Sequence, residues 1–181
     1  MLRVLVVALA LTVLLPGVAA AKEPAAVWAT VNVCDTAKQP DAIGLRASMP
    51  GTPRGARLSM RFQVEYRTTD GRWDDVADAD SGWRAVGTAK GAPVEYGWSF
   101  TFAKRSTPVT LRGVVKFRWR QGDRLPRQQE AATEAGHASK AGADPAGYSA
   151  ATFAASGLRH RCISSSSLRL AFARWASLTW P

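Results

Sequence analysis

An alternation of apolar and polar residues runs without a break through residues 57–67. Every second side chain is large and apolar, and the residues between are polar or charged. A period of two cannot place apolar side chains on one face of a helix, so it predicts a β-strand with one face on a core and the other in water. The apolar positions are Leu58, Met60, Phe62, Val64 and Tyr66.

Shorter alternations predict further strands along the chain. They lie at 27–34, 43–49, 73–76, 82–86, 96–102, 111–120, 124–129 and 148–153. Gly, Pro and Asp separate them, the acidic segment 74–81 is expected as a loop, and 130–147 as a long loop with one helical turn at 131–135 as an alternative. Pro126 marks 124–129 as an edge strand or a bulge. We predict an all-β, immunoglobulin-like antiparallel β-sandwich of about seven strands.

The first 21 residues have the layout of a secretory signal peptide, with a cationic start, an apolar middle and a small-residue exit. We therefore expect a secreted, extracellular protein with no membrane span in its mature form, and an uncleaved anchor is the alternative. Residues 22–153 are expected to form the sandwich. Residues 154–181 form an atypical basic tail, either disordered or carrying a short helix through Leu168, Phe172 and Trp175.

The chain has two cysteines, Cys34 and Cys162. An even number in an exported protein suggests a disulfide bridge, which would contribute about 4–5 kcal/mol for a loop of this size. A bridge requires the two Cα atoms to lie within about 7 Å of each other. Two unpaired thiols remain the alternative.

Basic residues crowd the predicted hairpin around residue 122, in a chain whose formal net charge is +10. Such a cluster predicts an anion-binding patch, with an anionic polymer or glycan of the cell envelope as partner. Nucleic acid is not expected, the oligomeric state is left open, and the alternative is a charged, solvated sheet face. The patch comprises Arg112, Lys116, Arg118, Arg120, Arg124 and Arg127, and Arg57, Arg61 and Arg67 lie on the polar face of another strand.

From the remaining polar residues we predict no catalytic site, no metal site and no cofactor. His137 near Ser139 and Asp144 could serve a small secreted hydrolase, which is the alternative function, although no strained elbow surrounds the serine. His137 and His160 with the cysteines are too scattered to suggest zinc. Five aspartates between Asp70 and Asp80 lack the spacing of an EF-hand calcium loop. Five tryptophans are expected to pack in the core rather than to stack on sugars: Trp28, Trp73, Trp83, Trp98 and Trp119.

Residues 66–76 and 82–86 resemble strands of an immunoglobulin- or fibronectin-III-like sandwich. Four stretches, 27–36, 43–51, 111–115 and 141–152, resemble a group of small secreted actinobacterial proteins to which no function is assigned. The resemblance implies fold and export, and it carries over no catalytic residue. Members of that group end soon after the last stretch with a cysteine close by. Here 28 further residues follow Phe153, so either Cys162 replaces that cysteine as the partner of Cys34, or the tail is frameshifted sequence.

Overall fold

The computed structural model describes residues 26–88, 90–103, 107–137 and 142–155. The described residues form strands and no helix, which confirms the predicted all-β sandwich. They contain eight strands rather than about seven, and the immunoglobulin-like class stays a prediction. The strands are β1 (Trp28–Cys34), β2 (Ala42–Pro50), β3 (Arg57–Arg67), β4 (Trp73–Thr88), β5 (Pro93–Thr101), β6 (Val109–Gln121), β7 (Arg124–Ala132) and β8 (Phe153–Ala155).

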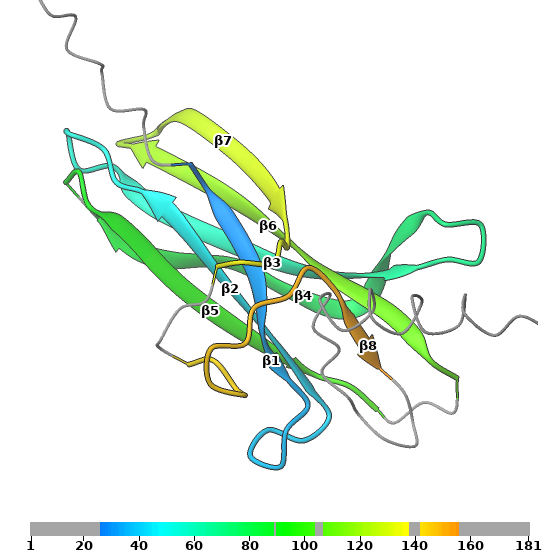
Figure 1. Ribbon diagram of the computed structural model, residues 1–181. Helices are drawn as coiled ribbons and strands as arrows, with labels where there is room; N and C mark the ends of the chain where they lie inside the picture. The colour runs from blue at the N-terminus through cyan, green and yellow to red at the C-terminus, as the bar shows by residue number, and fades with distance from the viewer. Residues whose placement is uncertain (1–25, 89, 104–106, 138–141, 156–181) are drawn as a thin grey trace, which may run out of the picture.

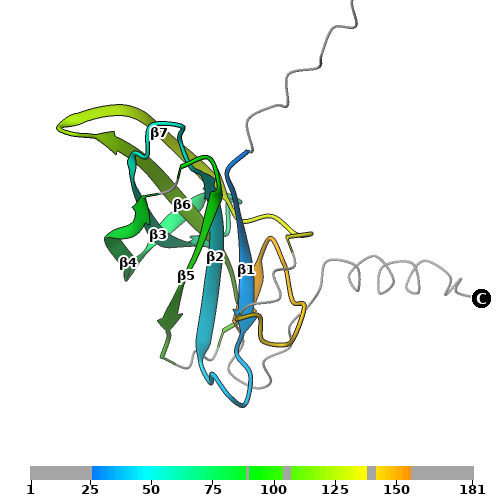
Figure 2. The same cartoon turned by 90° about the vertical axis from the view of Figure 1, so that its left-hand side faces the viewer.

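The strands form two antiparallel sheets. The smaller sheet has the order β1-β2-β5, and the larger has the order β4-β3-β6-β7, with β8 paired to the start of β6. Figures 1 and 2 show the smaller sheet lying across the larger one. No helix within the described part of the chain is long and apolar enough to cross a bilayer. The predicted signal peptide and the basic tail with its expected helix lie outside the described residues.

The core lies between the two sheets, where alternate residues of facing strands meet. Ile43 and Leu45 of β2 lie on one side, and Phe62 of β3 and Phe117 of β6 lie on the other; all are almost fully buried. Burial of each such side chain contributes about 1.5–3 kcal/mol relative to exposure. The predicted strand 57–67 coincides with β3, and its predicted inward face is confirmed for Leu58 through Val64.

Strand β1 is buried on both faces because a later segment covers it. Val31 exchanges backbone hydrogen bonds with Ala150, and the Asn32 carbonyl accepts from the Asp144 N–H. The Oγ1 of Thr30, which is fully buried, lies 2.8 Å from the Ser149 Oγ. Residues 142–150 thus supply an outer partner to β1, and the predicted long loop serves as a covering segment.

Cys34 ends β1 and is fully buried. Its sulfur is not a free thiol. Cys162 lies outside the described residues, so the pairing of these two cysteines stays a prediction.

The expected loop at 74–81 is wrong, because β4 continues through it. Between the Arg67–Trp73 pair and the Arg57–Thr88 pair, β4 has five more residues than β3, and three register shifts absorb the difference. The positive φ angles of Asp78 (61°) and Gly82 (62°) lie in these irregular stretches. The acidic segment therefore forms the β-bulges of one long edge strand, and the two short strands predicted around it are one element.

The segment after the β6–β7 turn also differs from expectation. Strand β7 continues to Ala132, so residues 131 and 132 belong to a strand and the alternative of a helical turn at 131–135 is wrong. The predicted strand at 148–153 is shifted, because β8 begins at Phe153 and pairs with Leu111. Strand β7 is an edge strand with a register shift close to Pro126, as that proline predicted.

Candidate binding face on the larger sheet

Strands β3 and β6 place basic side chains on the outer face of the larger sheet. Arg57 is paired with Arg120, and Arg61 with Lys116. The neighbouring Leu58 is fully buried, so the basic side chains point away from the core. We call this surface the basic face; its cations are Arg57, Arg61, Arg67, Arg112, Lys116, Arg118 and Arg120.

Three of these cations have a carboxylate partner. The Arg61 Nε lies 2.9 Å from each carboxylate oxygen of Asp80. The Arg112 Nε donates to Glu65 at 2.6 Å, and the Lys116 Nζ lies 3.7 Å from a Glu130 oxygen. These pairs cancel charge across the middle of the basic face, whereas the end nearest the β6–β7 turn has cations that pair with no described carboxylate.

The pair of Arg61 and Asp80 is the most closely bonded of the three. The hydrogen bond from Arg61 lowers the pKa of the Asp80 carboxyl below its usual 3.8, and the Gly82 N–H, which donates to Asp80 at 2.8 Å, adds to the effect. The same hydrogen bond raises the pKa of Arg61. Asp80 therefore stays ionised at neutral pH and holds the β4 bulge against β3.

Two arginines of the basic face lie over tryptophan rings of β4. The Arg118 Cζ lies 3.7 Å from the centroid of Trp83, and the Arg112 Cζ lies 4.4 Å from that of Trp73. The Arg118 Nε is buried and makes no hydrogen bond. Such contacts contribute about 0.5–2 kcal/mol and restrict the guanidinium to one position. Arg118 is thus fixed in place, although no carboxylate neutralises it.

Three cations gather at the end of the basic face nearest the β6–β7 turn: Arg57, Arg118 and Arg120. No carboxylate among the described residues forms an ion pair with any of them. Arg57 donates to the Gly122 carbonyl at 3.0 Å, so its partner there is uncharged. Like charges directly opposite each other on a sheet are destabilising, and Arg57 faces Arg120 across β3 and β6. We call these three residues the arginine cluster.

The structure brings together four of the six residues predicted as an anion-binding patch. Arg112, Lys116, Arg118 and Arg120 share the outer face of β6. Arg124 is exposed at the start of β7 and is paired with Gln121, which lies on the same side of the sheet as Trp119. Arg127 lies on the opposite face of the sheet: it pairs with Trp119, and its Cζ lies 4.6 Å from the centroid of that ring.

The tryptophans are less buried than expected. Trp119 is fully buried and donates its indole N–H to the Pro50 carbonyl at 2.8 Å. The other four are half-buried. Trp98 lies beneath Arg84, whose Cζ is 4.1 Å from the ring centroid. Trp28 stacks on His137, with ring centroids 4.7 Å apart.

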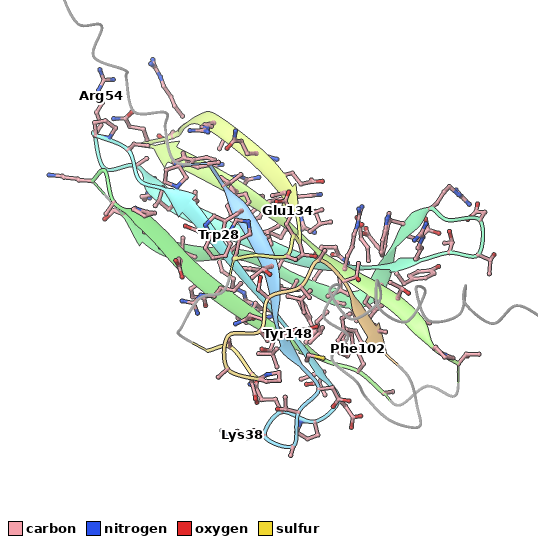
Figure 3. All side chains as sticks on the ribbon, viewed as in Figure 1. Trp28, Lys38, Arg54, Phe102, Glu134 and Tyr148 are labelled. Carbon is pink, nitrogen blue, oxygen red and sulfur yellow. The ribbon has the colours of Figure 1, made fainter. Side chains whose placement is uncertain are left out.

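The residues of the alternative hydrolase site do not form a triad among the described residues. The His137 Nε2 lies 3.8 Å from Glu134, which Figure 3 shows beside Trp28, whereas Asp144 accepts from the Thr36 hydroxyl. Ser139 and His160 lie outside the described residues. In the described part of the chain, no three His, Cys, Asp or Glu side chains lie close enough to hold a metal ion. Asp70, the first of the five aspartates, pairs with Arg72 at 2.6 Å.

Two features of this site could not be read from the sequence. Trp73 and Trp83 act as platforms for arginines of β6, two strands away, and the cross-strand register decides which side chains meet. The alternation around these residues predicts a face, but it does not predict a partner. The only hint in the sequence of these cation–π contacts is that arginine and tryptophan are both abundant in these predicted strands.

Comparison with known proteins adds no family to this description. The chain matches no protein-family model, and no curated protein is significantly similar to it.

Proposed function

We propose that this chain is a secreted, non-enzymatic β-sandwich protein that binds an anionic polymer of the cell envelope through its basic face. The observation that carries the proposal is the arginine cluster, in which none of the three guanidinium groups forms an ion pair with a described carboxylate. A face that served solubility alone would be expected to intersperse both signs, as the middle of this sheet does.

The geometry suits an extended polyanion. Arg57 and Arg120 lie side by side on neighbouring strands, so successive negative groups of a polymer could contact both. Arg118 is held over Trp83 before any ligand arrives, which lowers the entropy lost on binding. Arginine also binds phosphate, sulfate and carboxylate groups with two parallel hydrogen bonds, which favours a charged polymer over a neutral glycan.

The test is retention on immobilised heparin and on immobilised long-chain polyphosphate, measured as the salt concentration at elution. The double variant Arg57→Gln/Arg120→Gln removes two charges from the arginine cluster. The control Lys38→Gln/Arg72→Gln removes two exposed charges elsewhere, so the two proteins have equal net charge. Figure 3 labels Lys38 at the end of the molecule far from Arg54.

We expect the cluster variant to elute at clearly lower salt than the control, because binding at one site depends on local rather than on total charge. Equal elution of the two variants would contradict the proposal. Export is a separate part of it: the mature protein is expected in the culture supernatant, and retention inside the cell would contradict that part.

A further inference from the structure

A pocket of about 480 Å³ opens at the end of the sandwich where the β2–β3 loop meets β6 and β7. Its wall from the loop consists of Thr52, Pro53, Arg54 and Ala56. Its wall from the larger sheet consists of Trp119, Gln121 and Arg127. Because Trp119 and Arg120 are neighbours on β6, the pocket and the arginine cluster lie on opposite faces of the same sheet. We call it the Trp119 pocket.

The pocket walls are held in shape by internal hydrogen bonds. The Thr52 hydroxyl accepts from the Ala56 N–H at 2.9 Å, and the Thr52 carbonyl accepts from the Gly55 N–H at 3.0 Å. Gly55 has a φ of 67°, which suits the tight turn between them. Trp119 is fully buried at the base of the pocket, where its indole N–H is bonded to the Pro50 carbonyl and Arg127 lies over its ring. The pocket is therefore pre-formed, as ligand pockets usually are.

Two guanidinium groups give the Trp119 pocket a positive charge. Arg127 lies over Trp119 and donates to the Gln129 side-chain oxygen at 2.8 Å, which leaves its other N–H groups for a further acceptor. Arg54 is exposed at the tip of the loop, as Figure 3 shows, and makes no ion pair with any described residue. None of the described side chains that line the pocket is acidic.

We propose that the Trp119 pocket binds a small organic carboxylate. Its hydrocarbon body would lie against Pro53, above the buried Ala56 and Trp119, and its carboxylate would contact Arg127 and Arg54. We choose this ligand class because the pocket combines apolar lining atoms with two arginines that make no ion pair with any described residue. A neutral apolar ligand would leave both guanidinium groups without a counter-charge, and a polyanion would not cover the apolar atoms. A medium-chain fatty acid and an aromatic acid share this chemistry.

The test is calorimetric titration of the folded protein with octanoate and with benzoate, each compared with its neutral analogue, octanol or benzyl alcohol. For ligands of about ten heavy atoms we expect a Kd near 1 mM, roughly what such small molecules reach in a partly open pocket. Stronger binding of octanoate would indicate an aliphatic ligand, and stronger binding of benzoate an aromatic one. Equal binding of the acids and the alcohols, or no binding of either acid at millimolar concentration, would overturn the proposal.

Three variants locate the binding. Arg127→Gln is expected to weaken carboxylate binding about tenfold while the protein keeps its thermal unfolding temperature within a few degrees. Arg54→Gln, at the exposed loop tip, tests the charge without touching the core. The variant Arg57→Gln/Arg120→Gln should bind the carboxylate with unchanged affinity, because its residues lie on the other face. An unchanged affinity in both Arg127→Gln and Arg54→Gln would refute the site, whatever the result on heparin or polyphosphate.

Discussion

The Ser81 side chain replaces a hydrogen bond that the β-bulge of β4 removes from the β3–β4 ladder, so Ser81→Ala should destabilise the fold. Arg61 pairs with Trp83 and Gln63 pairs with Asp80, so the residue between them on β3, Phe62, faces two residues of β4. The Phe62 N–H finds no backbone carbonyl there and donates to the Ser81 Oγ at 2.8 Å. The same hydroxyl donates to the Gly82 carbonyl at 2.7 Å. One side chain thus serves both backbone groups of the bulge.

The expected cost of Ser81→Ala follows from burial. Phe62 is fully buried and Ser81 is 5% exposed, so water cannot easily replace the lost hydroxyl. A buried donor left without an acceptor costs about 1–3 kcal/mol. For a domain of this size, a loss of about 2 kcal/mol lowers the unfolding temperature by roughly 8 °C.

Thermal unfolding followed by circular dichroism measures that shift, and amide hydrogen exchange locates it. Ser59→Ala is the matched control: Ser59 lies on the basic face of the neighbouring strand and is only half-buried, so its loss should stay within about 0.5 kcal/mol. The Phe62 amide should exchange faster in Ser81→Ala alone. An unchanged unfolding temperature together with unchanged exchange at Phe62 would refute the reasoning.

Three further perturbations test other parts of the fold. Gly113→Ala should cost about 1–3 kcal/mol by chemical denaturation, since its new Cβ would come within 2.6 Å of both Leu45 methyl groups; wild-type stability would contradict this packing. Asp80→Asn should lower the free energy of unfolding by about 1 kcal/mol at pH 7, and this difference should vanish in acid. Arg61 lowers the pKa of Asp80 in the folded state, so the stabilisation by the Asp80 carboxylate is full above about pH 4 and is lost as the pH falls through the folded-state pKa. A pH-independent difference would count against that pair. Reduction with dithiothreitol should lower the free energy of unfolding by about 4 kcal/mol, because the Cys34 sulfur is not a free thiol. Two titratable thiols in the denatured, unreduced protein would contradict a disulfide bridge.

The sequence predicted those elements whose two faces differ sharply in polarity. Strand β3 alternates over its whole length, and the structure has the strand with the same bounds. Strand β6 extends the predicted 111–120 by two residues at its start and one at its end. In both strands one face packs on the core and the other faces water, so the alternation of apolar and polar residues directly indicates which side chains are buried.

Two predictions failed because of β-bulges, the loop at 74–81 and the face on which Arg127 lies, since a pattern of period two does not show how far a bulge shifts the register. The pairing of β6 with β7 shifts by one residue between Trp119 and Gln121. Without that shift Arg127 would pair with Arg118 on the basic face, as the sequence-based patch assumed. A slip of one residue moves a side chain to the other face, and the bulge near Pro126 moves Arg127 beneath the sheet.

That one bulge divides the predicted basic patch between the two proposed sites. It removes a charge from the outer face, where Arg118 and Arg120 remain, and it places the same charge over Trp119 in the wall of the Trp119 pocket. Since Trp119 and Arg120 are adjacent on one strand, the alternation of β6 separates the two proposed ligands by the thickness of a sheet. Each site can therefore be altered by substitutions that leave the other intact, and the two proposals can fail independently.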